Sequence, residues 1–435
     1  MKRPLLRLLS DHGMILVLAA LCAFFSLVTL TDQSVTGEAA VAQVVKEVKA
    51  GQTVMVVVRP SAEDSAYADA VAAQVKAAGA TVAAVVKGAP ADVRAALEKQ
   101  AATGAKVDAI LGTDETTRWL VLEEVAKDFA PLGTPRLVKP DSYRWPNFLK
   151  GDNLLNIANQ IAVIAIIAIG MTMVIITAGI DLSVGSLLAL AAVLVSWFIR
   201  EKAGALEAGT GGMVLASAVA ILACGLAGGF SGLMITRFSI PPFIVTLAMM
   251  LVTSGFAYTL AEGQSIYQIP DTFVWLGRGA DVLGIPNAVL LMLLLYVAAH
   301  LVMTQMRIGR YLYAVGGNRE AAHISGVPVE RVLMFAYVAS GLLAGLGGVV
   351  MASQLKSGSP TYGGMYELYV IAAVVVGGTS LSGGKGSMIG TLTGAFIIAV
   401  IQNGMNLTNV ESYTQKVVLG AVILGAVLVD KVRGK

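Results

Sequence analysis

Residues 377–387, GGTSLSGGKGS, combine glycines, hydroxyls and a lysine in a way that could bind a phosphate. A phosphate loop that closes on Gly384 and Lys385 requires glycine at position 379 and serine or threonine at position 386. The sequence has Thr379 and Gly386 at these positions. We therefore expect no ATPase site in this chain, so any energy from ATP has to come from another subunit.

Side chains suited to covalent or metal chemistry are few. The chain has three histidines and two cysteines, none at the spacing of a metal site, a disulfide framework or a nucleophile motif. They are His12, His300, His323, Cys22 and Cys224. This scarcity argues against an enzyme, and we expect the chain to bind no metal and no cofactor of its own.

Polar groups near the apolar segments are mostly uncharged. The carboxylates Asp181, Glu262 and Glu367 lie at predicted span ends, whereas an ion-driven carrier usually has them at mid-bilayer. Amides and hydroxyls can bond a neutral polar ligand without the cost of desolvating a charge, which is compatible with a sugar. The same groups also bridge helices. The candidates are Asn156, Asn159, Gln160, Thr172, Thr177, Gln264, Gln402, Asn403 and Asn406.

The elements that carry these groups belong to an integral membrane protein. The chain has 435 residues, of which 56% are hydrophobic and 14% charged, against about 25% charged in soluble domains. Residues 31–150 hold 14 Lys and Arg and 15 Asp and Glu, which is 29 of the 59 charged residues. That segment is therefore expected to be soluble. The net charge of +3 is too small to indicate nucleic acid.

Uncharged runs predict a membrane all-α polytopic bundle of about ten transmembrane helices. The run 13–30 is nearly long enough to cross a bilayer, so we favour a retained first helix in residues 1–30 over a cleaved signal peptide. Residues 151–435 form the expected membrane domain. Cations between the spans place both termini in the cytoplasm by the positive-inside rule. The further runs are 153–180, 182–199, 208–236, 238–261, 282–306, 332–355, 368–384, 386–410 and 417–429.

Residues 31–150 are predicted to be an inserted, extracytoplasmic α/β doubly wound domain. Strand-like and helix-like segments alternate in it, which is typical of a parallel sheet with helices on both faces. Strands are expected at 54–58, 81–86, 108–112 and 135–138, and helices at 63–78, 91–103 and 115–129. The stretches AGATVAAVV and GAKVDAILGTDETT resemble the N-terminal lobe of a periplasmic sugar-binding protein. A single lobe cannot close on a sugar, so docking or a degenerate remnant is expected.

Residues 305–330 form the longest polar interruption among the later spans. Arg307, Arg310, Arg319 and Arg331 lie in or beside it, which indicates a cytoplasmic loop. Asn318 fits an N-cap and Gly326 a C′ residue, enclosing a helix of about two turns. The loop is either an ordinary connection or a docking element for a cytoplasmic partner.

Two segments interrupt the spans in a similar way. AGIDLSVGS (178–186) and GGTSLSGGKGS (377–387) share Leu-Ser at the turning point, which suggests a weak internal repeat in parallel orientation. They are either tight glycine turns or broken helices of the kind that line substrate routes. Glycines at small-xxx-small spacing predict helices that approach closely in lipid. These pairs are Gly225/Gly229, Gly228/Gly232, Gly341/Gly345 and Gly390/Gly394.

From about residue 153 to residue 432 the chain resembles the permease subunit of ribose-type ABC sugar importers, in the branched-chain amino acid and sugar permease superfamily. Five stretches carry the resemblance, in the same order as in that family. They are IAIGMTMVIITAGIDLSVGSLLAL (167–190), FIVTLAMMLVTSG (243–255), GRYLYAVGGNREAAHISGV (309–327), YELYVIAAVVVGGTSLSGGKGSMIGTL (366–392) and NGMNLTNVESYTQKVVLGAVILGAVLVD (403–430). Residues 31–150 depart from that pattern, since the family normally has a short external loop there.

The resemblance implies a transporter of the bacterial inner membrane. Two permease copies, identical or paralogous, would form the pathway, and two cytoplasmic ATPase subunits would bind ATP and Mg²⁺ beneath them. A periplasmic sugar-binding protein is a further candidate partner, and residues 31–150 would be periplasmic. Coupling to the ATPase would fall on Gly309, Arg310, Gly316, Asn318, Glu320, Ala321 and Gly326. The substrate pathway would fall on Asp181, Ser183, Ser382, Asn403 and Asn406.

Other classes remain open from the sequence alone. Within ABC permeases, an amino acid or a nucleoside could replace the sugar. An ion-coupled secondary carrier would need no ATPase partner, and the sparse mid-membrane carboxylates argue against it. A membrane sensor would use residues 31–150 as its receiver, but we expect it to carry a cytoplasmic output domain.

Overall fold

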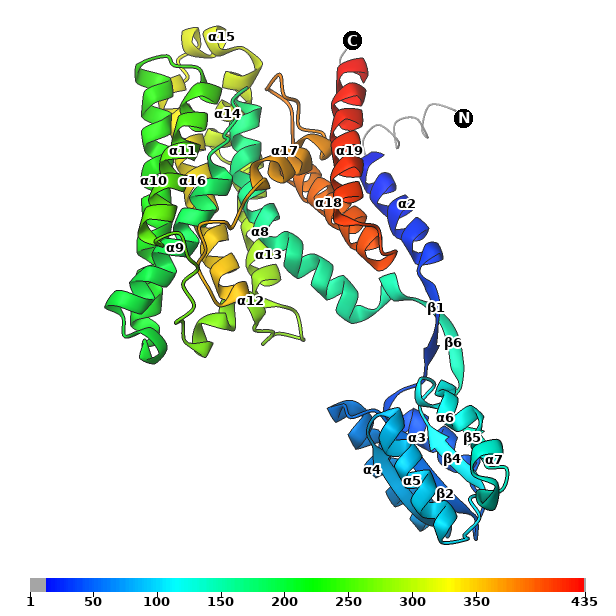
Figure 1. Ribbon diagram of the computed structural model, residues 1–435. Helices are drawn as coiled ribbons and strands as arrows, with labels where there is room; N and C mark the ends of the chain where they lie inside the picture. Colours follow the sequence, from blue (N-terminus) through cyan, green and yellow to red (C-terminus); the bar gives the residue numbers. More distant parts are fainter. Residues whose placement is uncertain (1–12, 434–435) are drawn as a thin grey trace, which may run out of the picture. The chain divides into compact units, whose positions relative to one another are not determined.

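The computed structural model describes residues 13–433 and divides the chain into two compact units (Figure 1). One unit comprises Met1–Thr29 and Asn147–Lys435, and the other comprises Leu30–Pro146. We call them the membrane unit and the inserted unit. The basic residues Lys2, Arg3, Arg7 and Lys435, which were used to orient the termini, lie outside the described residues, as does His12.

Seven helices of the membrane unit are long and apolar enough to cross a membrane. They are α8 (Gly151–Ile176), α9 (Val184–Lys202), α10 (Thr210–Arg237), α11 (Pro242–Leu260), α13 (Asn287–Gln305), α16 (Val329–Leu355) and α18 (Met388–Leu407). Two apolar helices are shorter, α2 (Gly13–Val28) and α17 (Tyr366–Val376), and α19 (Ser412–Arg433) ends the described chain. The connections contain η3 (Asn147–Leu149), η4 (Ala205–Glu207), η5 (Asp271–Val274), α12 (Trp275–Arg278), α14 (Arg307–Gly317) and α15 (Arg319–Ile324).

The run 368–384 does not form the span that its composition predicts. Its helix α17 has 11 residues, which corresponds to about 17 Å of rise against a hydrocarbon core of about 30 Å. Gly377 and Gly378 follow, and Gly378 has φ +89°, a conformation that favours glycine and cannot continue the helix. The chain therefore leaves helical structure part-way and runs as a loop to Ser387. By length, the described residues contain seven candidate spans where about ten were expected.

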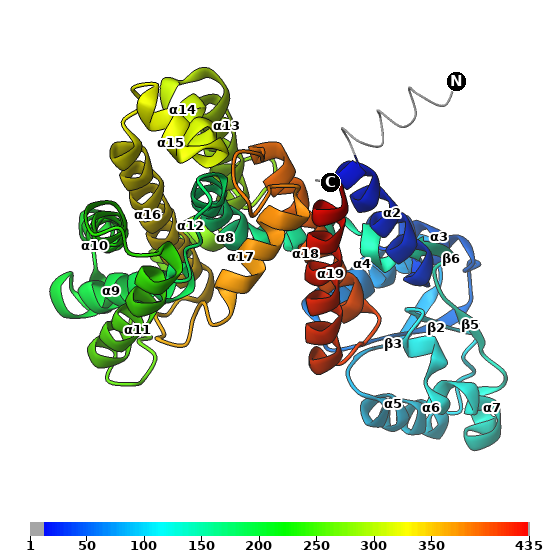
Figure 2. The same cartoon turned by 90° about the horizontal axis from the view of Figure 1, so that it is seen from above.

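Helix α8 is the centre of the membrane unit. It is apolar on all sides, which is typical of a helix surrounded by protein, and every residue from Ile161 to Ile176 is buried. Seen from above, α8 lies between the group α9, α10, α11 and α16 and the group α17, α18 and α19 (Figure 2). α8 contacts α16 of the first group and α17 and α18 of the second.

The predicted close approach of glycine-bearing helices is confirmed between α10 and α16. A Cβ added at Gly228 would lie 2.3 Å from the carbonyl oxygen of Tyr337, and one at Gly341 would lie 2.3 Å from that of Cys224. Gly390 and Gly394 of α18 meet the end of α17 in the same way. In lipid, where no hydrophobic effect drives association, this backbone contact supplies van der Waals attraction.

The inserted unit contains a parallel sheet with strand order β3-β2-β4-β5. Its strands are β2 (Thr53–Val58), β3 (Thr81–Lys87), β4 (Ala109–Gly112) and β5 (Arg136–Val138). Its helices are α3 (Gly37–Lys46), α4 (Ala62–Ala77), α5 (Pro90–Ala102), η1 (Thr116–Arg118), α6 (Leu120–Glu123), α7 (Val125–Asp128) and η2 (Ala130–Leu132). Alternate residues of β2 point to opposite faces, so Val56 packs with α3 and α4 while Val57 packs with α5 and α6.

Two features of this unit differ from the sequence expectation. The helix expected at 115–129 is broken into η1, α6 and α7. The breaks fall at Trp119, which is extended with ψ 132°, and at Glu124, which has ψ 15°. Helix α3, which precedes the first strand of the sheet, was not predicted.

A two-stranded antiparallel ribbon closes the inserted unit where it begins and ends. β1 (Leu30–Ser34) pairs with β6 (Ser142–Pro146), with Leu30 opposite Pro146. In the membrane unit, the amide of Asn147 donates to the carbonyl of Thr29 at 2.9 Å, and the amide of Phe148 donates to the Thr29 hydroxyl at 3.1 Å. Because its two ends are adjacent, the unit can be inserted without separating the flanking helices.

Candidate coupling site

The polar stretch after α13 folds as two helices rather than one. α14 (Arg307–Gly317) precedes α15 (Arg319–Ile324), and Asn318 separates them in extended conformation. The predicted caps are confirmed, since the Asn318 side-chain oxygen accepts from the Ala321 amide at 2.9 Å and Gly326 has φ +82°. Helix α14 was not predicted, because glycines 309, 316 and 317 lower its intrinsic helix propensity.

The two Leu-Ser segments share a turn geometry as well as a sequence. After α8, the Asp181 carboxylate accepts from the Ser183 amide at 3.0 Å and from its hydroxyl at 2.6 Å. After α17, the Ser380 hydroxyl oxygen accepts from the Ser382 amide at 3.4 Å. In both segments a side chain bonds the backbone two residues further on. The first turn is buried and the second is exposed.

Helix α14 rests on both turns. A Cβ added at Gly316 would lie 1.7 Å from the carbonyl oxygen of Ile176 and 2.7 Å from the amide nitrogen of Gly384. These two groups bond each other, since the Gly384 amide donates to the Ile176 carbonyl at 2.9 Å. The Tyr313 hydroxyl donates to the Gly386 carbonyl at 2.9 Å. The end of α8, the turn after α17 and α14 therefore meet at one point, and only glycine fits at position 316.

The buried turn is also hydrogen-bonded to α16, the helix that follows α14 and α15. The Ser340 hydroxyl of α16 donates to the second Asp181 oxygen at 2.8 Å, and Asp181 is 1% exposed. Three donors thus satisfy this carboxylate. The Tyr337 hydroxyl is buried and has no hydrogen-bond partner among the described residues, and a Cβ at Gly179 would lie 2.5 Å from it. Asp181 therefore ties the end of α8 to α16.

The outer side of α15 is exposed. Asn318, Glu320 and Ala321 are exposed, and Ile324 has 80% of its surface exposed. A cavity of about 850 Å³ lies between α15 and the start of α16. Among residues 13–433, no ion pair includes Arg307, Arg310, Arg319 or Arg331. An exposed apolar side chain among unpaired cations suits a protein partner.

The residues expected along a substrate pathway lie in three places. Asp181 and Ser183 share the buried turn, and Ser382 lies in the exposed turn. Asn403 exchanges amide hydrogen bonds with Asn153 of α8 at 2.8 and 3.1 Å. Asn406 accepts from Gln415 of α19 at 2.8 Å. The structure thus brings Asp181 and Ser183 together, while the two asparagines join helices at the far end of α18.

Comparisons with known proteins identify the membrane unit. Residues 153–427 match the family described as branched-chain amino acid transport system / permease component. The chain belongs to this permease family. Residues 30–146, the inserted unit, lie outside the match.

The permease also has close relatives among curated proteins. It is 43% identical over 289 residues to the ribose import permease protein RbsC of Escherichia coli (strain K12), which covers 66% of this chain and 87% of the relative. It is 44% identical over 288 residues to RbsC of Bacillus subtilis (strain 168), with the same coverage. The D-allose transport system permease protein AlsC of Escherichia coli (strain K12) is 35% identical over 288 residues, covering 66% and 86%. No solved structure matches this permease.

Three contacts of the permease were missed by sequence reasoning. Tyr313 lies in α14. Its aromatic hydroxyl, in a stretch rich in glycine, could have indicated a hydrogen bond to the backbone. Ser340 gave no signal, because it is one of many small residues in an apolar run. Thr172 of α8 and Thr391 of α18 share a hydroxyl hydrogen bond of 2.7 Å. The threonine pair therefore joins α8, which precedes the buried turn, to α18, which follows the exposed turn.

The hydrogen bonds of Asp181 predict different effects for two substitutions. Asp181→Ala leaves the Ser183 amide and the Ser183 and Ser340 hydroxyls without an acceptor in a buried site. We expect it to destabilise the permease by about 3 kcal/mol, at roughly 1–3 kcal/mol for each buried group left unpaired. Asp181→Asn keeps an acceptor for Ser183, and its amide can donate to the Ser340 hydroxyl, so a loss below about 1 kcal/mol is expected.

Denaturant unfolding of the purified permease in mixed micelles measures both variants of Asp181. Equal losses of unfolding free energy would contradict the hydrogen-bond account. If Asp181→Asn is stable but transports poorly, the carboxylate has a role beyond holding the turn.

Proposed function

We propose that this permease is the membrane subunit of an ABC importer that carries a ribose-type monosaccharide across the bacterial inner membrane. Membership of the permease family supports the class, and relatives named as ribose, D-allose and xylose permeases support the substrate. The permease component leaves ATP hydrolysis to separate subunits, so this chain is not an enzyme. In this proposal ATP and Mg²⁺ are bound by those ATPase subunits.

The proposed mechanism rests on the contact of α14 with both turns. ATP-driven closure of two ATPase subunits would press on α15 and the cavity beside it, where Asn318, Glu320, Ala321 and Gly326 lie. α14, with Gly309, Arg310 and Gly316, would pass the displacement to Ile176 and Gly384. Because packed interfaces switch between discrete arrangements, a small shift there can reorient α8 relative to α18. The cavity would then change from outward-open to inward-open.

The pathway in this proposal follows α8, which contacts α16 in one helix group and α17 and α18 in the other. Asp181, Ser183 and Ser382 would act at its inner end, where the two turns lie. Asn403 and Asn406 would act at the other end of α18, where their amides can exchange a helix-bridging bond for a sugar hydroxyl. Neutral amides and hydroxyls suit an uncharged ligand, because no charge has to be desolvated.

The assembly and orientation are part of the same proposal. A second permease copy would complete the pathway, with a periplasmic sugar-binding protein delivering substrate. Both termini would be cytoplasmic and the inserted unit periplasmic, on the charge bias of the loops. Helices α2, α17 and α19 would add to the seven long spans, giving about ten membrane segments.

Removal of the coupling element tests the proposed function. We expect that replacing residues 318–326 with a Gly-Ser linker reduces ATP-dependent uptake of radiolabelled ribose to background. The reason is that the linker removes α15 and its caps while α14 and the spans remain. Uptake is measured in cells that also express the ATPase subunit, with membrane insertion checked by protease accessibility.

A matched linker in residues 203–207, the connection between α9 and α10, serves as the control and is expected to leave uptake intact. Undiminished uptake by the 318–326 variant would remove the coupling assignment. Purification of the intact chain in mild detergent adds a second test, since an ABC importer subunit should retain a stoichiometric ATPase.

An amino acid is the second candidate substrate, because the family description names branched-chain amino acid transport. Competition in the uptake assay separates the two. We expect unlabelled ribose, D-allose or D-xylose to compete and leucine to have no effect. Competition by leucine alone would replace the sugar with an amino acid and leave the coupling mechanism unchanged.

A further inference from the structure

The inserted unit contains a cavity at the carboxyl edge of its parallel sheet. Its volume is about 730 Å³, within the range of small-molecule sites. The segments that follow β2, β4 and β5 line it, with Asp64, Asp114 and Pro140 among the lining residues. In open α/β sheets ligands bind at this edge, at the point where the strand order reverses. Here the order reverses at β2, since β3 lies on one side of it and β4 on the other.

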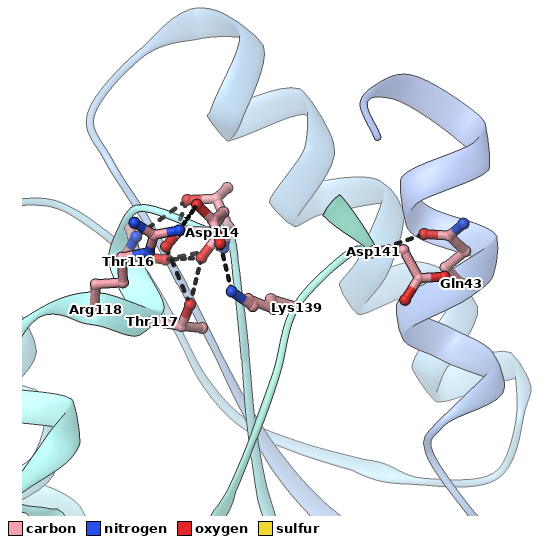
Figure 3. A network of polar contacts seen from close by, with 8 residues as sticks. Gln43, Asp114, Thr116, Thr117, Arg118, Lys139 and Asp141 are labelled. Atoms are coloured by element: carbon pink, nitrogen blue, oxygen red, sulfur yellow. Dashed lines mark hydrogen bonds and ion pairs between the residues drawn. The ribbon is translucent and has the colours of Figure 1, made fainter. Parts of the chain in front are cut away.

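Helix α3 supplies the opposite wall of the cavity. Residues 34–38 and the first turns of α3 line one side, and α4 lines the other. The amide of Asp141, which follows β5, donates to the Gln43 side chain of α3 at 3.0 Å, so α3 is held to the sheet edge (Figure 3). The cavity therefore has two walls within this one unit. This differs from the expectation of a lone lobe with nothing to close against.

The floor of the cavity is held in place by a network after β4. The Thr116 hydroxyl donates to the carbonyl of Val57 in β2 at 3.0 Å, and the Thr113 amide donates to the Thr116 hydroxyl oxygen at 2.9 Å. Asp114 forms ion pairs with Arg118, at 2.7 Å, and with Lys139 (Figure 3). The ends of β2 and β4 are thus tied together before any ligand arrives, which is the pre-organisation that a binding site needs.

The charges of the cavity favour a ligand that offers hydrogen-bond donors and carries no negative charge. Asp64 pairs with Arg59 at 2.9 Å and Asp114 with Lys139 and Arg118, so both carboxylates are already neutralised yet keep lone pairs. Lys139 first, and then Arg118, hold the pKa of Asp114 below its ordinary value, so it is an acceptor at neutral pH.

Two further properties of the lining narrow the ligand class. Glu38 and Glu63 also line the cavity, and no ion pair among residues 13–433 includes them, so an anion is disfavoured. Ala66, Ala70 and the ring of Tyr67 form an apolar side on α4. Carboxylate acceptors beside a small apolar surface match a molecule with hydroxyls on its edge and C–H groups on its face.

We propose that this cavity binds a neutral, hydroxyl-rich small molecule of monosaccharide class, giving the permease a ligand site of its own outside the membrane unit. The choice of a monosaccharide among polyols rests on the proposed function. The site is open at one side, so part of the ligand stays in water. The expected dissociation constant is on the order of 1 mM, weaker than that of an enclosed site.

The test uses the full-length chain with its ATPase partner in lipid nanodiscs. Binding of D-ribose, D-allose and D-xylose is measured by saturation-transfer NMR and calorimetry at up to about 50 mM. ATP-dependent uptake is measured in the same preparations after transfer to liposomes, with the periplasmic sugar-binding protein present. Ala66→Leu extends a side chain into the cavity from the exposed side of α4. Ala73→Leu makes the same change on the same helix at an exposed position outside the cavity.

We expect wild type and Ala73→Leu to bind at least one of the sugars, and Ala66→Leu to bind it at least about tenfold more weakly. Equal binding by Ala66→Leu would overturn the proposal, since the ligand would then occupy another site. Absence of sugar binding to wild type would also overturn the cavity proposal. If that preparation still shows ATP-dependent uptake, the proposed function is retained. Ala66-sensitive binding without uptake would support the cavity and count against the proposed function.

Discussion

Gly316→Ala is expected to lower ATP-dependent uptake at least about tenfold, the size of a lost coupling between two sites. The added methyl would lie 1.7 Å from the Ile176 carbonyl oxygen, which is backbone and cannot rotate away. α14 must therefore move away from the two turns. The hydrogen bond from the Gly384 amide to the Ile176 carbonyl lies at the same point. Uptake is measured at matched membrane expression, together with the ATPase rate of the purified complex.

Gly317→Ala is the control for this experiment. It makes the same change at the next residue of α14, where an added Cβ meets nothing within 4 Å. We expect uptake within about twofold of wild type, because alanine also raises helix propensity there. If the two variants transport equally, the contact of α14 with the turns does not carry coupling. If Gly316→Ala uncouples ATPase activity from uptake, the contact acts as proposed.

Gly341→Leu is expected to lower the unfolding free energy by about 3 kcal/mol, at the upper end of overpacking effects. Gly341 of α16 packs against the backbone of α10, where an added Cβ would meet the Cys224 carbonyl oxygen at 2.3 Å and Gly228 Cα at 3.2 Å. A leucine there must separate the two helices along their contact. Denaturant unfolding of the purified chain in mixed micelles measures the loss.

Gly255→Leu is the matched control, placed on the exposed side of α11 where a Cβ meets nothing within 4 Å. A small gain or no change is expected, since leucine has the higher helix propensity. A loss at Gly255 as large as that at Gly341 would show that the micelle assay reports hydrophobic bulk rather than helix packing.

The parts of the fold that could be predicted are those set by residues a few positions apart in the sequence. The strand at 54–58 lies within β2 (Thr53–Val58) and the helix at 63–78 within one residue of α4 (Ala62–Ala77), because each is a short pattern bounded by turn residues. The caps of α15 were predicted for the same reason, since Asn318 and Gly326 act on backbone groups a few residues away.

Predictions failed where a distant contact or a competing local bond decided the conformation. The run 368–384 has the composition of a span, yet its helix ends at Val376, and Gly377 there packs against the carbonyl of Gly390 in α18. The helix expected at 115–129 is interrupted at Trp119 and Glu124, after a start where threonine hydroxyls bond the turn that follows β4. Helix α3 went unpredicted, although it walls the cavity of the inserted unit.

By itself, the sequence determined the class of this protein and the kind of residue in its sites. Charge-free runs require a membrane, clustered charges require a soluble insert, and small residues at a spacing of four permit close helices. Only the tertiary structure decided which residues meet. Gly316 lies against Ile176 and Gly384, and Asp64 lies in one cavity with Asp114, although each pair is far apart in the chain. The physical reason is that periodicity and capping act over a few residues, whereas helix contacts and strand order are set by packing of the whole unit.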